Sequence, residues 1–162
     1  MSRTTIRATV ASFLSPPNVA GLNKVFTAAP KRVEGTWFRY GQPAGTFSGG
    51  IGVVNIVAVR EERIALGGEH GGKKWIHYEV SLDIFFHSVH RHSEDAMADF
   101  DTLIDNIKTR IRADRRLGND AVIFESGERY LDGEYGEPRV LQDGATEIWG
   151  SIRFEVSEVI TS

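Results

Sequence analysis

The sequence contains no cysteine, so it offers no thiol nucleophile, no thiolate zinc site and no disulfide framework. Long apolar runs are also lacking, because none approaches the roughly 18 residues that a membrane-spanning helix needs. The first residues, Met-Ser-Arg-Thr-Thr-Ile-Arg, do not form the apolar core of a signal peptide. Together these absences predict the cytosol as the compartment.

Signatures of common catalysts are missing as well. There is no Gly-x-Ser-x-Gly elbow, which positions the nucleophile of many hydrolases. The glycine-rich stretch 67–74 has the composition of a phosphate-binding loop, but it lacks the spacing of such a loop, and Trp75 follows its lysines instead of a hydroxyl residue. We therefore predict an interaction or connecting loop at this stretch, with no catalytic residue and no cofactor in the chain.

His87, His90 and His92 are potential metal ligands, since imidazoles close in sequence can share a metal ion. Their spacing matches no strong zinc pattern, and Arg91 places a positive charge between two of them. The pattern favours a solvated connection between two elements, so we predict no metal-binding residue. A metal-dependent enzyme that uses these three histidines is the alternative from a different functional class.

The composition is that of an ordinary globular protein. The chain has 162 residues, of which 41% are hydrophobic and 25% are charged. This length and balance predict a single domain, residues 1–162, with one core. Glycine-rich stretches predict loops at 41–52, 67–73 and 125–145. The last of these is either a long irregular loop or a ragged hairpin.

The stretch 74–116 organises the chain. From Trp75 to His87 apolar and polar side chains alternate, with Phe85 as the exception, which predicts a long strand with one buried side. From Met97 to Ile111 apolar residues recur at spacings of three and four, which is typical of a helix with one apolar stripe. A helix that lies on a sheet buries both apolar surfaces.

The long helix is expected at about 93–117, because Ser93 is a good N-cap and Gly118 follows the last turn. Its acids come early and its bases late, which complements the helix dipole. The remaining predictions are a helix at 4–14, strands at 24–30, 51–60, 121–124 and 146–160, and an extended segment at 33–40. The strand 51–60 is apolar on both faces, so we expect it to be covered on both. The fold class is α+β, a mainly antiparallel sheet with the long helix and the N-terminal helix packed on it.

Charge is unevenly distributed along the chain. Residues 1–60 carry seven Lys/Arg and one acid, whereas residues 118–162 carry ten acids and three Arg. This asymmetry suggests complementarity within the chain or between copies, although two independently solvated surfaces would have the same composition. The candidate interface residues are Arg3, Arg7, Lys31, Arg32, Trp37, Phe38, Arg39, Tyr40, Lys73, Lys74, Glu128, Asp132, Glu134 and Glu137. The basic end of the long helix could touch nucleic acid, but the overall acidity of the chain favours a solvated helix end there.

Three segments together resemble a known family. The first, 63–82, reads Arg-Ile-Ala-Leu-Gly-Gly-Glu-His-Gly-Gly-Lys-Lys-Trp-Ile-His-Tyr-Glu-Val-Ser-Leu. The second begins Phe86-His-Ser-Val-His-Arg-His-Ser-Glu-Asp and continues into the helix that ends Ile-Arg-Ala-Asp-Arg-Arg-Leu-Gly118. The third is the late strand near the C-terminus. The combination resembles the tail terminator, or tail completion, proteins of long-tailed bacteriophages over most of the chain beyond residue 50.

The resemblance implies a small domain of mainly antiparallel sheet with helices packed on it, and no enzymatic activity. It implies a hexameric ring that caps the finished tail tube, stops its polymerisation and offers a surface to the head–tail connector. The implied partners are further copies of the chain, the tail tube protein, the connector protein and DNA, which passes through the lumen without sequence-specific binding. No membrane partner is implied. The implied location is the tail or neck of the virion, after assembly in the host cytoplasm. Another connector or neck ring protein is the nearby alternative.

Overall fold

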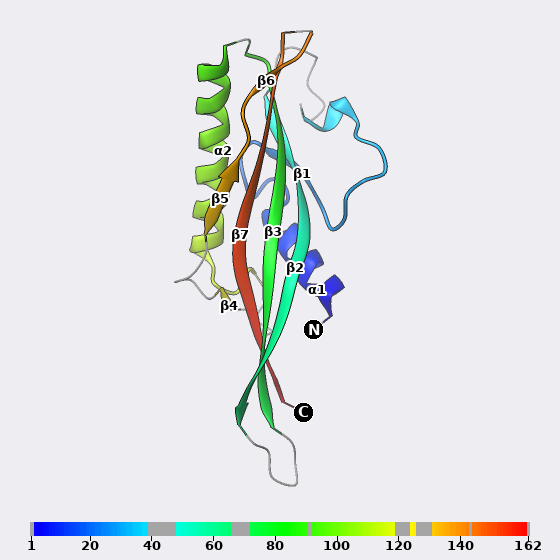
Figure 1. The fold of residues 1–162 in the computed structure, drawn as a ribbon, viewed down its shortest axis with the longest axis vertical. Coiled ribbons are helices and arrows are strands. Elements are labelled where there is room, and N and C mark those ends of the chain that lie inside the picture. Colours follow the sequence, from blue (N-terminus) through cyan, green and yellow to red (C-terminus); the bar gives the residue numbers. More distant parts are fainter. Residues whose placement is uncertain are drawn as a thin grey trace.

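The computed structural model describes residues 2–38, 48–65, 72–90, 92–118, 124–125, 131–142 and 144–161. These residues form one seven-stranded sheet and two α-helices, which confirms the predicted α+β class (Figure 1). The helices are α1 (Arg3–Leu14) and α2 (Ser93–Ala113), with a short 3-10 helix, η1 (Gly35–Trp37). The strands are β1 (Leu22–Phe26), β2 (Gly49–Ala65), β3 (Lys73–Ser88), β4 (Phe124–Glu125), β5 (Asp132–Tyr135), β6 (Arg139–Val140) and β7 (Thr146–Thr161).

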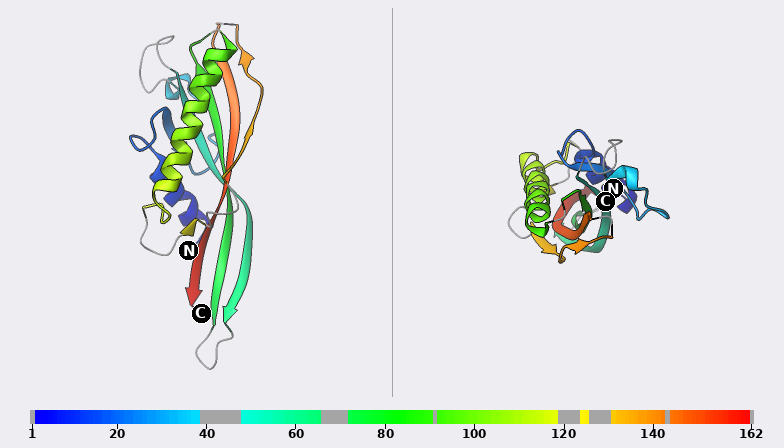
Figure 2. Two further views of the ribbon diagram at one scale, coloured as in Figure 1. Left: turned by 90° about the vertical axis from the view of Figure 1, so that its left-hand side faces the viewer. Right: turned by 90° about the horizontal axis from the view of Figure 1, so that it is seen from above.

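Three long strands make the centre of the sheet, with β3 lying between β2 and β7 and antiparallel to both. At one edge, β1 runs parallel to the first residues of β2. At the other edge, the short strands β4, β5 and β6 all pair antiparallel with β7. The sheet is therefore mainly antiparallel, as predicted. Figure 2 shows that it is strongly twisted and that both helices pack against it from one side.

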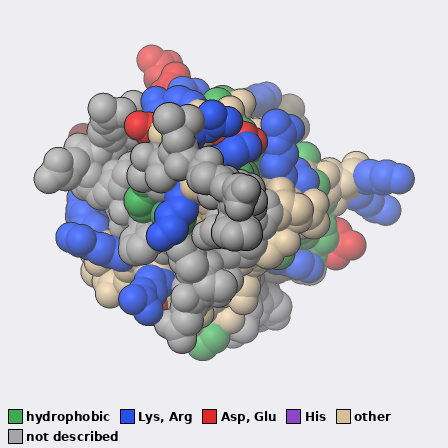
Figure 3. Space-filling model, turned by 90° about the horizontal axis from the view of Figure 1, so that it is seen from below, with side chains coloured by type: hydrophobic (Ala, Val, Ile, Leu, Met, Phe, Trp, Pro, Cys, Tyr) green, Lys and Arg blue, Asp and Glu red, His purple; other side chains and the backbone are tan. Residues whose placement is uncertain are grey.

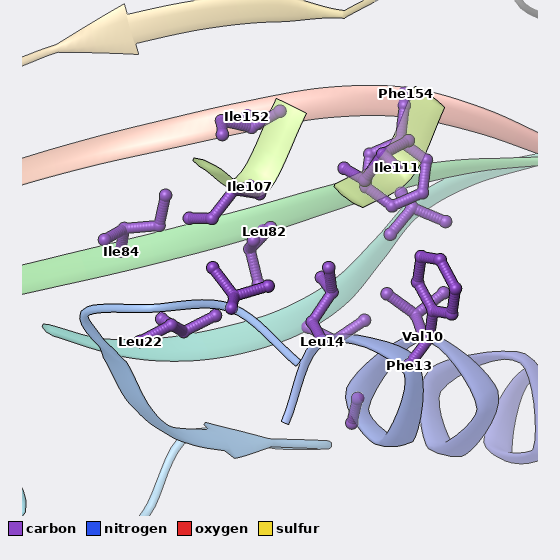
Figure 4. Packing of buried hydrophobic residues seen from close by; sticks show 14 of the residues in the cluster. Val10, Phe13, Leu14, Leu22, Leu82, Ile84, Ile107, Ile111, Ile152 and Phe154 are labelled. Atoms are coloured by element: carbon purple, nitrogen blue, oxygen red, sulfur yellow. The ribbon is translucent and has the colours of Figure 1, made fainter. Parts of the chain in front are cut away.

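The core lies between the sheet and the two helices. Alternate residues of β3 and β7 face the core, as the period-two pattern predicts, and so does the apolar stripe of α2. On β7 the polar residues Ser151, Glu155 and Ser157 of the opposite face are buried as well. Figure 4 shows Ile107 and Ile111 of α2 beside Ile152 and Phe154 of β7. The buried apolar residues of these elements are Ile76, Tyr78, Val80, Leu82, Ile84 and Phe86 of β3, Ile148, Ile152, Phe154 and Val156 of β7, and Ala96, Phe100, Leu103, Ile104, Ile107 and Ile111 of α2.

The three long strands continue beyond the ends of both helices. We call this extension the arm and define it as residues 60–65, 73–77 and 157–161, which are joined in register through Arg60, His77 and Ser157. Figures 1 and 2 show the arm projecting from the helix-covered part of the sheet, with the C-terminus at its side. The arm makes the molecule elongated and gives it two different ends.

Several predicted boundaries were wrong. The predicted loops at 41–52 and 67–73 are too long, since β2 begins at Gly49 and β3 at Lys73. The loop predicted at 125–145 contains β5 and β6, because the outer edge of β7 offers backbone hydrogen-bonding groups to this segment. The segment predicted as extended at 33–40 contains η1 instead.

The ends of the long helix also differ from the prediction. His92, and not Ser93, occupies the N-cap position, and its side chain forms no capping hydrogen bond. The helix ends at Ala113 because the Asp114 carboxylate accepts hydrogen bonds from the backbone N–H groups of Arg116 and Gly118, at 2.9 and 3.0 Å. Gly118, with a φ of 70°, therefore closes a separate turn and not the helix itself.

The first part of β2 is buried on both faces, but the rest is not. Ile51, Val53 and Val54 are buried, whereas Val57 is 55% exposed. The burial differs along β2 because residues 29–38 lie over only the beginning of the strand. The prediction of a strand covered on both faces is correct for 51–54 and wrong for the remainder.

Candidate interaction surfaces

An apolar groove of about 610 Å³ opens on the sheet at the end away from the arm. Its floor is a cross-strand row of register partners, Ile51 on β2, Phe85 on β3 and Trp149 on β7. Phe85 and Trp149 are 42% and 39% exposed, which is a large apolar area for neighbouring residues on one sheet face. Exposed apolar surface of this kind marks binding sites in soluble proteins.

The sequence contained a signal for this groove. Phe85 is the residue that breaks the alternation of β3, and Trp149 is an aromatic residue on the mostly polar face of β7. Their meeting could not be predicted, because it depends on the register between two strands that lie far apart in the sequence.

Two walls enclose the groove. One is the segment before and after η1, which contributes Pro30, Val33 and the predicted interface residue Phe38. The other comes from the segment around β6 and contains the predicted residue Glu137 together with Arg139. The predicted residues Lys31 and Arg32 are exposed within the first wall. The basic N-terminal segment and the acidic C-terminal segment thus meet at one groove within one chain.

Trp37 has a structural role that the sequence did not indicate. Its ring packs against Phe26 of β1 with a centroid separation of 5.0 Å. The Lys24 ammonium lies over the same ring, 4.6 Å from its centroid, in a cation–π contact. These contacts attach η1 to the edge strand and so position the first wall of the groove.

The other predicted interface residues are distributed over the molecule. Lys73 and Lys74 begin β3 on the arm, where Lys74 pairs with Glu61 at 3.5 Å. Asp132 and Glu134 are exposed on β5. Arg3 and Arg7 lie on α1. The predicted residues Arg39, Tyr40 and Glu128 lie outside the described part of the chain.

The three histidines of the predicted alternative do not converge. His87 lies on β3, where the Phe38 ring meets it edge-on at 5.6 Å, and His90 pairs with Asp99 of α2 at 3.2 Å. His92 is exposed at the N-cap of α2. Within the described residues no group of three His, Asp or Glu side chains is arranged to hold a metal ion. No described contact therefore favours the metal-dependent alternative.

A different histidine forms a polar cluster at the base of the arm that the sequence did not reveal. His77 Nδ1 lies 2.9 Å from Glu155 Oε1 and 3.0 Å from Ser157 Oγ, and Nε2 lies 3.4 Å from Glu62. Ser157 and Glu155 are 2% and 9% exposed, so the serine hydroxyl is not open to a substrate. The contacts of His77 with both residues tie β3 to β7.

Tyr78 and Glu158 form a buried pair on the core face of β3 and β7, and the sequence did not predict this pair either. The Tyr78 hydroxyl donates a hydrogen bond of 2.7 Å to Glu158. Burial, and then the hydrogen bond to the Glu158 carboxylate, raises the pKa of Tyr78 far above its ordinary value. The phenol is therefore a permanent donor to a buried carboxylate.

Neither helix in the described part of the chain has the combination of length and apolar character that crossing a bilayer requires. Chemically, the surfaces described above can bind apolar and charged groups. Comparison with known proteins finds no family model that matches this chain and no match among curated protein sequences.

Proposed function

We propose that this chain is a tail terminator of a long-tailed bacteriophage, a structural protein without enzymatic activity. In this role, six copies form a ring that caps the tail tube, stops its polymerisation and presents a surface to the head–tail connector. The ring resides in the tail or neck of the virion, is assembled in the host cytoplasm, needs no membrane and lets DNA pass through its lumen. The resemblance of segments 63–82 and 86–118 to that family supports this proposal.

The observation that carries the proposal is the presence of two unlike exposed surfaces at opposite ends of one elongated chain. A cyclic ring is built from heterologous contacts, so each copy must present one surface to the copy before it and a different one to the copy after it. The apolar groove over Phe85 and Trp149 and the projecting arm meet this requirement. A mixed sheet with helices on one side also agrees with the fold that the resemblance implies.

The proposal is tested on the purified protein by size-exclusion chromatography with light scattering and by negative-stain electron microscopy, alone and with isolated tail tubes. We expect rings of uniform size that bind one end of the tubes, and tubes of excessive length in phage that lack the protein. Rings that bind only connectors would identify another neck protein. A protein that stays monomeric with tubes, and whose absence leaves tail length unchanged, would refute the proposal.

A further inference from the structure

We infer that the outer edge of β2 binds an extended segment of a different protein as an additional strand, and that this segment carries acidic residues opposite Arg60 and Arg63. The edge is open because β1, the neighbour of β2 on that side, ends at the position of Val53. Beyond Val53, all pairings of β2 that the described residues form are with β3. An open strand edge presents unpaired backbone N–H and C=O groups to an incoming strand.

The two outer edges of the sheet differ in this respect. Along the outer edge of β7, the short strands β4, β5 and β6 pair at intervals from Thr146 to Ser157. Among the described residues, no strand pairs in the same way with β2 beyond Val53. The edge of β2 is therefore the place where the sheet can take a further strand without displacing one that it already has.

Two irregularities in the pairing of β2 with β3 limit the length of the site. The register shifts between Ile56 and Ala58, and it shifts again between Arg63 and Ala65. Between these shifts, residues 58–63 keep a continuous register with β3, and most of their side chains are exposed. A bulge bends and twists its strand, so an added strand loses its pairing there. We therefore expect a segment whose paired part is no longer than residues 58–63.

The two acidic residues of the site already have contacts on β3. Glu61 lies 3.5 Å from the Lys74 ammonium, and Glu62 lies 3.4 Å from His77 Nε2. The two glutamate side chains are nevertheless 58% and 65% exposed. Each carboxylate can therefore accept a second contact, from a basic residue on the outer side of β2.

The two arginines of the site have no such contacts. Within the described part of the chain, neither Arg60 nor Arg63 forms an ion pair with a carboxylate. Arg63 lies opposite Lys74 in the register, and like charges in directly opposite positions destabilise a strand pair. Figure 3 views the molecule from the arm end, where Lys and Arg are the prominent charged side chains. Acidic residues on an added strand would relieve this excess of positive charge.

The same charges disfavour a second copy of this chain as the occupant. If two copies paired centrally along this edge, Arg60 would lie opposite Arg63 and Glu61 opposite Glu62, so that every charge met a like charge. The order Arg-Glu-Glu-Arg instead matches the order acid-base-base-acid. Both orders read the same in either direction, so the match holds for parallel and antiparallel addition.

The test uses two labelled peptides of identical composition and the monomeric fraction of the full chain. The matching peptide is Thr-Glu-Lys-Lys-Glu-Val-Thr, and the control peptide, Thr-Lys-Glu-Glu-Lys-Val-Thr, has its charges exchanged. Fluorescence anisotropy is measured at about 50 mM salt, where exposed charges are weakly screened. We expect a dissociation constant below about 1 mM for the matching peptide. The control should bind about tenfold more weakly or worse, because four cross-strand charge pairs change from attractive to repulsive.

Strand addition also has a signature that a purely electrostatic contact lacks. Only alternate backbone N–H groups of an added strand point toward β2. Of two matching peptides that are N-methylated on one or the other alternate set, one should lose binding and the other should keep its affinity within about threefold. The unmethylated matching peptide should also slow hydrogen exchange at alternate backbone amides of residues 58–63.

The variant R60E/R63E should bind both peptides equally, because each peptide then makes two attractive and two repulsive charge pairs. The matched control is K31E/R32E, which makes the same change of charge at the far end of the molecule and should keep the preference of wild type. Both pairs are exposed, so the denaturation midpoints of the two variants should stay near that of wild type.

Absence of binding at about 1 mM peptide, equal affinity of wild type for both peptides, or equal effects of the two N-methylated sets would overturn the inference. Self-association of wild type that the matching peptide displaces would also overturn it, because the occupant would then be a second copy. The comparison of peptides on wild type needs neither the variants nor ring formation, so it can fail while the proposed function holds.

Discussion

Tyr78 and Glu158 lie diagonally across β3 and β7, and the tyrosine hydroxyl donates a 2.7 Å hydrogen bond to the Glu158 carboxylate. Both side chains are buried, Tyr78 at 3% and Glu158 at 4% exposure. The pair joins the two strands on their core face at the base of the arm. His77 with Glu155 and Ser157 joins the same strands on the opposite face.

The buried tyrosine should make stability fall at alkaline pH. Its pKa is raised in the folded state, so above about pH 10 the unfolded chain releases a proton that the folded chain keeps. The stabilisation is complete below the unfolded pKa and declines as pH rises above it. The free energy of unfolding, measured with urea at pH 9 and at about pH 11, should fall less for Y78F than for wild type. The difference between the two proteins should be up to about 1.4 kcal/mol per pH unit.

The exposed Tyr135 provides the control for this measurement. Y135F should lose as much stability as wild type over the same pH interval. At neutral pH, Y78F should be destabilised by about 1–3 kcal/mol, because the buried Glu158 carboxylate loses this donor. An alkaline response of Y78F equal to that of wild type would contradict the assignment.

The sheet-and-helix core predicts large effects of truncation. Ile84 of β3 and Ile104 of α2 are 0% and 4% exposed, so I84A and I104A should each reduce the free energy of unfolding by about 2–5 kcal/mol. The exposed Val57 on β2 provides the comparison, and V57A should cost less than about 0.5 kcal/mol. Urea denaturation followed by circular dichroism measures all three. Losses below about 0.5 kcal/mol at both isoleucines would mean that the buried faces are wrongly assigned.

Gly150 should resist enlargement because α2 crosses β7 closely at that position. A Cβ atom there would lie 2.7 Å from the Phe100 ring and 3.2 Å from the Tyr135 ring. Both rings are packed against each other edge-on, so neither moves without loss of contact. G150A should therefore cost about 1–3 kcal/mol of stability.

Gly35 in η1 is the matched site, since a Cβ there would meet no atom within 4 Å. G35A should leave the thermal midpoint within a few degrees of wild type. Equal thermal midpoints for G150A and G35A would contradict the close approach of α2 to β7.

If the groove is a ring contact, a charge on its floor should prevent assembly without unfolding the chain. Trp149 is partly exposed there, so W149E should abolish rings in light scattering while changing the unfolding free energy by less than about 1 kcal/mol. V57E, at an exposed site outside the groove, is the control and should still assemble. Rings of W149E that are as stable as those of wild type would exclude the groove as the contact.

The charge asymmetry gives a second test of assembly. Exposed ion pairs are weak individually, about 0–1 kcal/mol each, and are screened by salt. If they hold ring junctions, K31E/R32E should weaken the ring, E134K/E137K in the same chain should partly restore it, and low salt should favour it. Assembly that is indifferent to salt and to both reversals would leave the apolar groove as the remaining contact.

The sequence by itself determined the main elements and their buried faces. Alternation from Ile76 to Phe86 and from Ile148 to Val156 specified which side of each strand faces the core, because successive side chains of a strand point to opposite faces. The spacing from Phe100 to Ile111 specified the stripe of α2 for the corresponding reason. These are local properties, so they can be read without knowing which elements meet.

Only the tertiary structure decided which residues meet. Strand register brings Phe85 to Trp149 and Tyr78 to Glu158, and helix packing places Arg110 on Phe13. The edge of β7 also pairs with residues 132–135 and 139–140. This pairing uses backbone hydrogen-bonding groups, which a side-chain pattern does not predict. The groove and the buried polar pairs are products of pairing across long sequence separations, which local periodicity does not specify.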